Sequence, residues 1–108
     1  MNVKFFEQEG VAVFQVTGEI NISTSPELKK LFEKDPKKKI VIDFENVTYL
    51  DSSGLATLVE VLKKTKNQGG ALGLSNMPGK IKSLFEITKL DKLFSIFQSQ
   101  ADAVSQVK

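Results

Sequence analysis

The sequence predicts an α/β fold with a mixed, mostly parallel central sheet and helices packed on it. Short apolar runs alternate with segments whose apolar residues recur at helical spacing, the pattern of strands connected by helices. The clearest run, Ile40 to Phe44, is apolar apart from Asp43, as expected for a buried strand. With 108 residues, 41% of them hydrophobic, the chain can build one packed core. We therefore expect a single domain spanning residues 1–108.

The first half of the chain is expected to hold three strands and one helix. Residues 5–9 and 11–18 are predicted strands joined by a tight turn, and the second is apolar on both faces. A helix is predicted to begin at Ser25-Pro26, because proline suits the first turn of a helix. The buried strand at 40–44 follows, and residues 46–50 are expected to be a connection.

The second half is expected to hold three helices and two strands. Residues 53–67 are the strongest predicted helix, with an apolar stripe along one face, lysines near its end and glycines 69–70 as its stop. A strand at 71–74 and a helix at 78–86 follow, then a short strand at 94–97. A last helix at 100–107 lies in a polar segment that we expect to fray.

The predicted order of elements is therefore β-β-α-β-α-β-α-β-α. The residues expected to be buried together in the core are Val13 or Phe14, Val41, Ile42, Leu55, Leu58, Val59 and Leu62.

Composition excludes several kinds of chemistry. The chain contains no cysteine and no histidine, which removes disulfides, thiolate chemistry and the usual general base and metal ligand. All 15 basic residues are lysine, so bidentate guanidinium recognition is absent. The formal charge of +2 is close to balance. No segment has the features of a signal peptide or a membrane span, so we expect a cytoplasmic protein with no membrane partner.

The most informative motif is Asp51-Ser52-Ser53-Gly54, at the start of the strongest predicted helix. Unpaired N–H groups and a partial positive charge at a helix start favour a phosphate. A serine at this place is also an ordinary N-cap. From the residues alone, both interpretations stay open: a capping serine, or a serine that accepts a modification.

Other candidate sites are weaker. Acidic residues near strand ends could converge on Mg²⁺, but their spacing is not diagnostic and we predict no metal site; they are Glu19, Asp43, Glu45 and Asp51. Without histidine, neither motif serine has a base to activate it, so we predict no catalytic residue and no cofactor. The basic run at residues 34–39 is interpreted as a solvated loop, with a phosphate or nucleic-acid contact as the alternative; we predict no nucleic-acid partner.

Several segments together resemble the bacterial anti-sigma-factor antagonists, the single-domain members of the STAS group. The resemblance spans essentially the whole chain and is carried by Tyr49-Leu50-Asp51-Ser52-Ser53-Gly54-Leu55, Val16-Thr17-Gly18-Glu19-Ile20, Ile40 to Phe44, Gly69-Gly70, Ile81 to Phe85 and Leu90 to Phe94. One departure is Asn21, where the family commonly has aspartate; asparagine keeps the hydrogen bonding and loses the charge.

The resemblance implies a regulatory role. Such proteins bind an anti-sigma factor, usually a serine kinase of the histidine-kinase-like ATPase type, and thereby free a sigma factor. The kinase phosphorylates the serine after the motif aspartate, here Ser52 with Ser53 as second choice, and a serine phosphatase reverses the modification. The expected partner-binding residues are Asn21, Ile22, Ser23, Thr24, Asp51, Ser52, Ser53 and Gly54.

Three other functions remain open at this point. The chain could be a STAS interaction module of a larger sensory assembly without a phosphorylation switch. It could be a small hydrolase that uses Ser52 with a lysine base, or a protein that binds nucleic acid through its basic run. For the favoured function, Ser52 must be accessible to solvent at its helix start.

Overall fold

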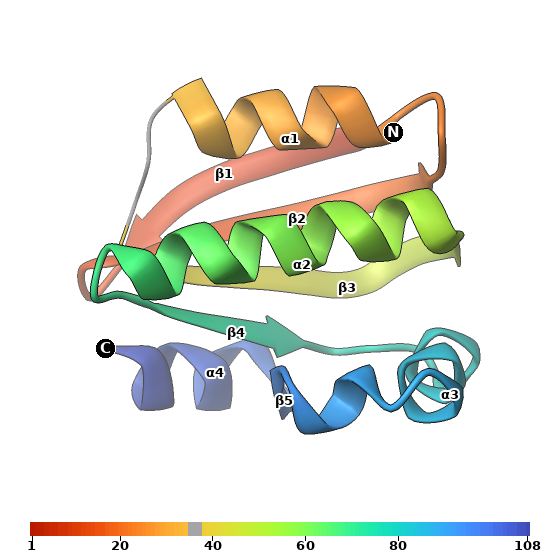
Figure 1. Cartoon of the computed structure of the whole chain (residues 1–108). Helices are drawn as coiled ribbons and strands as arrows, with labels where there is room; N and C mark the ends of the chain where they lie inside the picture. Colours follow the sequence, from red (N-terminus) through yellow and green to blue (C-terminus); the bar gives the residue numbers. More distant parts are fainter. Residues whose placement is uncertain (35–37) are drawn as a thin grey trace.

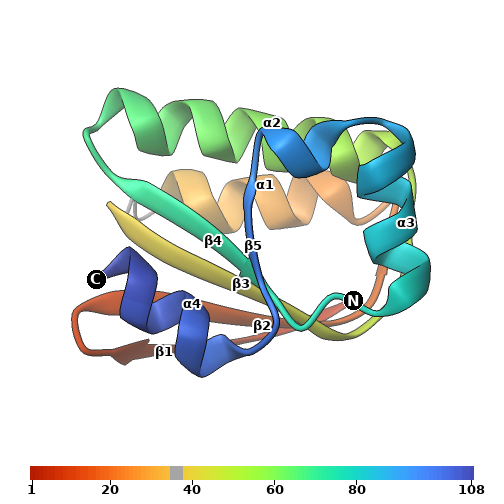
Figure 2. The same cartoon turned by 90° about the horizontal axis from the view of Figure 1, so that it is seen from below.

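The computed structural model describes residues 1–34 and 38–108, so the middle of the basic run predicted as a loop, residues 35–37, lies outside the described residues. The described chain forms a five-stranded sheet with helices on both faces (Figures 1 and 2). Its elements are β1 (Asn2–Gln8), β2 (Val11–Ile20), α1 (Ser25–Lys34), β3 (Lys39–Leu50), α2 (Ser52–Asn67), β4 (Ala71–Ser75), α3 (Gly79–Ile87), the 3₁₀ turn η1 (Leu90–Lys92), β5 (Ser95–Phe97) and α4 (Gln100–Val107).

The strands lie side by side in chain order, β1-β2-β3-β4-β5. The β1–β2 hairpin is antiparallel, and every other pair is parallel. The predicted fold class and element order are confirmed. Parallel strands place their carboxyl ends at one end of the sheet, so the segments after β2 and β3 lie near each other there.

The sheet separates two apolar clusters, which corrects the prediction of one shared core. Phe14 and Ile42 face α1 and α2, together with Leu55, Leu58 and Leu62. Val13 and Val41 point to the opposite face, where α4 covers them (Figure 2). Val59 is half-buried at the margin of the first cluster. Side chains alternate between the two faces of a strand, so neighbouring residues such as Val41 and Ile42 cannot share a cluster.

β3 is longer than predicted, and the expectation of a connection at residues 46–50 is wrong. Residues 46–50 form the last part of β3 and pair with the end of β2, from Thr17 with Asn46 to Ile20 with Leu50. Two register shifts interrupt the pairing. The sequence did not predict this part of the strand because most of its side chains are polar and exposed: Glu45, Asn46, Thr48 and Tyr49. As a consequence of the pairing, the strand ends set Asn21 and Asp51 next to each other.

The C-terminal helix is packed rather than frayed. Three of its residues are buried against the face of the sheet opposite α1 and α2: Ala103, Val104 and Val107. Ser99 caps this helix, since its hydroxyl accepts a hydrogen bond from the Asp102 N–H at 3.1 Å. The prediction of a polar tail missed this stripe because only one face of the short helix is apolar.

We predict that Leu58→Ala lowers the free energy of unfolding by about 2–5 kcal/mol, because Leu58 is 0% exposed and its removal leaves a cavity. Chemical denaturation measures the change. The exposed Lys63→Ala on the same helix is the matched control and should change stability by no more than about 0.5 kcal/mol. Equal stability of the two variants would contradict this placement of α2.

Candidate functional site

Ser52 is the first residue of α2 and is exposed, as the favoured function requires. Its position follows from the sheet, because β3 ends at Leu50 beside Ile20 of β2, and the helix starts two residues later. Within the described part of the chain, neither the Ser52 hydroxyl nor the Ser53 hydroxyl has a hydrogen-bond partner. Ser53 is half-buried, so Ser52 is the more accessible of the two.

Asp51, rather than either serine, caps α2. Its carboxylate Oδ1 accepts a hydrogen bond from the Gly54 N–H at 3.0 Å, which is the bond of an N-cap. The interpretation of a capping serine is therefore wrong. Asp51 lies in extended backbone immediately before the helix, the conformation in which a side chain can reach the N–H three residues ahead. With the cap provided by Asp51, both serine hydroxyls stay available.

The same carboxylate also joins α2 to the loop between β2 and α1. Oδ2 of Asp51 accepts a hydrogen bond from the Ile22 N–H at 3.2 Å, and the Asp51 N–H donates to the Ile20 carbonyl at 3.2 Å. Two segments 29 residues apart in the chain are thus held together through one side chain. The loop at 21–24 and the start of α2 form one continuous surface.

Within this loop, Asn21 and Thr24 use their side chains internally. The Asn21 Oδ1 accepts from the N–H groups of Ser23 at 2.9 Å and Thr24 at 3.1 Å. The Thr24 hydroxyl accepts from the Asn21 N–H at 2.8 Å and donates to the Glu19 carbonyl at 2.9 Å. An asparagine oxygen is sufficient for this turn, so the departure from aspartate at position 21 leaves the local structure satisfied.

The predicted partner-binding residues therefore divide by exposure. Ile22, Ser23 and Ser52 are exposed, and Ile22 shows 73% of its surface. Four others are half-buried and support the exposed residues: Asn21, Thr24, Asp51 and Ser53. Gly54 is buried, and its contribution is to packing.

Gly54 lets α2 approach the sheet closely. A Cβ at this position would meet the Leu50 side chain and would lie 2.9 Å from Ile20 Cγ2 and 3.0 Å from the Ile20 carbonyl oxygen. A side chain larger than hydrogen would push the helix start away from the ends of β2 and β3. The motif glycine thus sets how near Ser52 lies to the loop at 21–24.

The acidic residues considered for a metal site do not converge. Among the described residues, no group of three or more potential ligands is arranged to hold a metal ion. Asp43 is buried and accepts hydrogen bonds from Ser75 Oγ at 2.9 Å, Asn76 Nδ2 at 2.7 Å and the Glu45 N–H at 3.0 Å. It fixes the segment after β4, a role that sequence reasoning missed because its partners lie 32 and 33 residues away.

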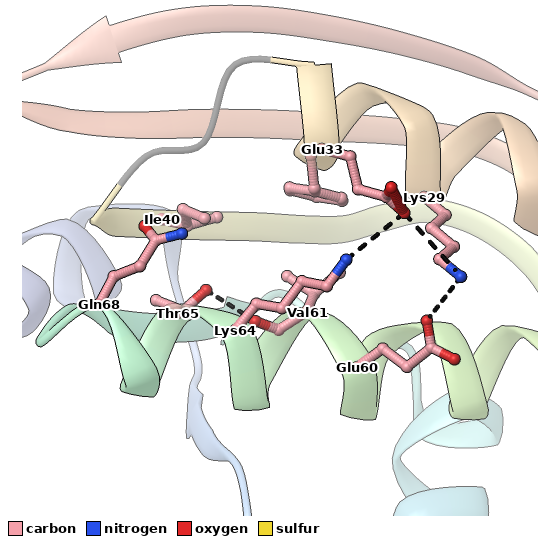
Figure 3. Close-up of a pocket in the computed structure, with 9 residues that line it drawn as sticks. Lys29, Glu33, Ile40, Glu60, Val61, Lys64, Thr65 and Gln68 are labelled. Atoms are coloured by element: carbon pink, nitrogen blue, oxygen red, sulfur yellow. Dashed lines mark hydrogen bonds and ion pairs between the residues drawn. The ribbon is translucent and has the colours of Figure 1, made fainter.

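A recess of about 240 Å³ lies between α1 and α2 (Figure 3). Phe32, Ile40 and Val61 supply its apolar lining, and ion pairs cross it, with Lys29 Nζ 3.1 Å from Glu60 and Lys64 Nζ 3.5 Å from Glu33. None of its lining residues belongs to the motif or to the loop at 21–24.

The ion pairs over this recess hold the two helices together. The hydrogen bond and the charge of Glu60, and then the charge of Glu33, raise the pKa of Lys29 above 10.5. Because the pKa is raised in the folded state, the pair stabilises the fold below pH 10.5, and this contribution is lost as pH rises through the folded value. Lys29 is exposed to water, so the effect is modest. We interpret the recess as a helix–helix contact rather than a ligand site.

In the described residues, no helix has the length and apolar character needed to cross a membrane.

The fold and the site define a small α/β domain in which an exposed serine opens a helix beside an exposed loop. The family model for the STAS domain matches residues 2–103, and the chain belongs to this family. It is 31% identical over 99 residues to an anti-sigma-B factor antagonist of Staphylococcus aureus (strain NCTC 8325 / PS 47), covering 89% of this chain and 92% of the relative.

Two further similar proteins are also named anti-sigma factor antagonists. The chain is 32% identical over 100 residues to the anti-sigma-B factor antagonist of Bacillus subtilis (strain 168), covering 89% of this chain and 90% of the relative. Among solved structures, an anti-sigma factor antagonist from Mycobacterium paratuberculosis superposes with a TM-score of 0.87 at 29% identity, over 98% of this chain and 92% of that one.

We predict that Gly54→Ala destabilises the protein. Overpacking costs about 1–3 kcal/mol, and the better helix propensity of alanine returns only up to about 1 kcal/mol. Gly79→Ala is the matched control, because it also lies in the first turn of a helix but its added Cβ meets nothing within 4 Å. That variant should be neutral or more stable by up to about 1 kcal/mol. Thermal and urea unfolding of both variants decide the comparison, and equal effects would refute the close approach at Gly54.

Proposed function

We propose that this protein is an anti-sigma-factor antagonist, which binds an anti-sigma factor, frees a sigma factor and is switched off by phosphorylation of Ser52. The observation that carries the proposal is the Ser52 hydroxyl, exposed and without a hydrogen-bond partner in the described chain, at a helix start joined through Asp51 to an exposed loop. The named function of the two curated relatives, matched over 90% or more of their length, supports it.

The proposed partner surface consists of Ile22, Ser23 and Ser52, built on Asn21, Thr24, Asp51, Ser53 and Gly54. Ile22 supplies an apolar contact that is mostly exposed in the free protein. The proposed partner is an anti-sigma factor with serine kinase activity and a histidine-kinase-like ATPase fold, and a serine phosphatase restores the unmodified form. Both would act on this chain in the cytoplasm.

The switch acts on the partner surface rather than on the fold. A phosphate adds about −1.5 to −2 charges at Ser52. The N-terminus of α2 attracts this charge by about 0.3–1 kcal/mol, while the neighbouring Asp51 carboxylate repels it, so the effects on folding oppose each other. At an interface, juxtaposed like charges cost several kcal/mol, and each 1.4 kcal/mol or so changes affinity about tenfold.

This proposal assigns the chain binding rather than catalysis, because Ser52 has no histidine to activate it. The alternative, a STAS module of a larger signalling assembly, uses the same surface without modification. Incubation with host lysate and ATP, followed by mass spectrometry, separates the two. A phosphate on Ser52 supports the switch, phosphate on Ser53 moves it by one residue, and an unmodified protein supports the alternative.

We predict that Ser52→Ala binds the anti-sigma factor like the unmodified protein and resists inactivation by ATP. Ser52→Asp should bind more weakly, but less weakly than the phosphorylated form, since one carboxylate carries about half the charge of a phosphate. Titration calorimetry with the anti-sigma factor measures these affinities.

The exposed Ser105→Asp on α4 is the matched control and should leave the affinity unchanged. Equal affinities of the unmodified, Ser52→Asp and phosphorylated proteins would contradict a switch at Ser52.

A further inference from the structure

β1 is an edge strand of the sheet that the described residues form. It is the first strand in the sheet order, with β2 as its one neighbouring strand among the described residues, and it pairs with β2 without a register shift, from Asn2 with Thr17 to Gln8 with Val11. Natural edge strands are usually short, bulged, interrupted by proline or lined with lysine. β1 contains no proline, glycine or bulge and one lysine, whereas the opposite edge strand, β5, has three residues.

This edge also carries exposed apolar side chains. Phe5 is 48% exposed, and its ring lies 5.0 Å from that of Phe14. Leu31 of α1, 39% exposed, lines a recess between β1 and α1 together with Met1 and Val3. On the other face of the strand, Phe6 is half-buried at the margin of the cluster that contains Val13 and Val41. Unpaired backbone groups and apolar side chains are the two features that favour strand addition.

From this edge we infer that β1 pairs with β1 of a second copy of the chain, antiparallel, about a two-fold axis at Phe5. In this register Phe5 lies opposite Phe5 of the second copy, Lys4 opposite Phe6, and Val3 opposite Glu7. The two members of each pair lie on the same face of the sheet, as two-fold symmetry about this axis requires, and successive pairs alternate between the two faces. The exposed faces of the two aromatic rings cover each other.

The charges of β1 favour a second copy in this register over the alternatives. A two-fold axis at Lys4 places two lysines opposite each other, and an axis at Glu7 places two glutamates opposite each other. An axis at Phe6 sets the exposed Phe5 opposite the Glu7 carboxylate. A parallel pair in register aligns every like charge. The antiparallel pair at Phe5 places no like charges opposite each other and brings the two exposed Phe5 rings together.

The dimer leaves the candidate site free. Ser52 follows β3, and β2 lies between β3 and β1 in the sheet (Figure 1). Because the β1 strands run antiparallel, the carboxyl ends of the parallel strands point in opposite directions in the two copies. The dimer therefore presents two Ser52 surfaces at opposite ends of one continuous sheet. This arrangement holds whether or not Ser52 is phosphorylated.

One seven-residue edge falls short of the roughly 1,600 Å² buried in a tight complex, so we expect a weak and concentration-dependent dimer. Sedimentation velocity of the intact chain from about 10 µM to about 1 mM tests it. The average mass should rise towards that of a dimer across this range. Phe5→Lys places two lysines on the axis and should remain a monomer throughout.

Ile87→Lys is the matched control, because it replaces another exposed apolar residue, 79% exposed, outside β1. It should dimerise as the parent does. Circular dichroism and thermal unfolding check that each variant is folded. A parent protein that stays monomeric to the highest concentration, or a folded Phe5→Lys that dimerises like the parent, would overturn the proposal.

Cross-linking tests the register independently. The chain has no cysteine, so introduced thiols report unambiguously. The register places position 3 of one copy opposite position 7 of the other, so a mixture of Val3→Cys and Glu7→Cys proteins should form a mixed disulfide under mild oxidation. Each variant alone should form far less. A dimer that gives no mixed disulfide would show that another surface is used.

Discussion

The candidate site depends on the carboxylate of Asp51. One oxygen accepts the Gly54 N–H and caps α2, and the other accepts the Ile22 N–H of a separate loop. A serine in this position offers one oxygen on a shorter side chain, and an asparagine offers one acceptor oxygen and an amide that only donates. Of the usual capping residues, only a carboxylate side chain presents an acceptor in both directions. The residue before Ser52 thus both caps the helix and holds the loop at 21–24 beside the serine.

The pairing of β2 with β3 positions the two segments that Asp51 joins. β2 and β3 stay paired to their last residues, Ile20 and Leu50, so the segments that follow leave the sheet side by side. The two register shifts earlier in this pairing keep the strands together over an irregular stretch. Gly54 then allows the first turn of α2 to lie against both strand ends. Exposure of Ser52 follows from this packing, because the helix turns its buried residues, such as Leu58, towards the core.

Sequence reasoning reached the fold class and the accessibility of Ser52, because both depend on local patterns. Alternating apolar runs identify strands and helices, and a polar motif before an apolar stripe marks a helix start. It failed at the second half of β3, where the pairing partner lies about 30 residues away and the exposed side chains conceal the strand. It also failed to separate Val41 from Ile42, because a run that is apolar at successive positions does not reveal that two different layers cover it.

The identity of the cap shows a third kind of limit. Asp51, Ser52 and Ser53 are all good capping residues, and a shift of one residue in the helix start decides which one acts. The pairing of Leu50 with Ile20 and the packing of Gly54 decide it in favour of Asp51. Neither is visible in the local sequence, since each depends on a contact between β2 and the segment after β3.

The most direct test of this account is hydrogen exchange at the amides of Ile22 and Gly54, resolved by NMR, in the parent protein and in Asp51→Ala. If one carboxylate holds both segments, exchange at the two amides should accelerate together, while amides at the centre of β3, such as that of Ile42, keep their protection. Acceleration at Gly54 alone would show that the loop at 21–24 holds its place without Asp51, and would contradict the account.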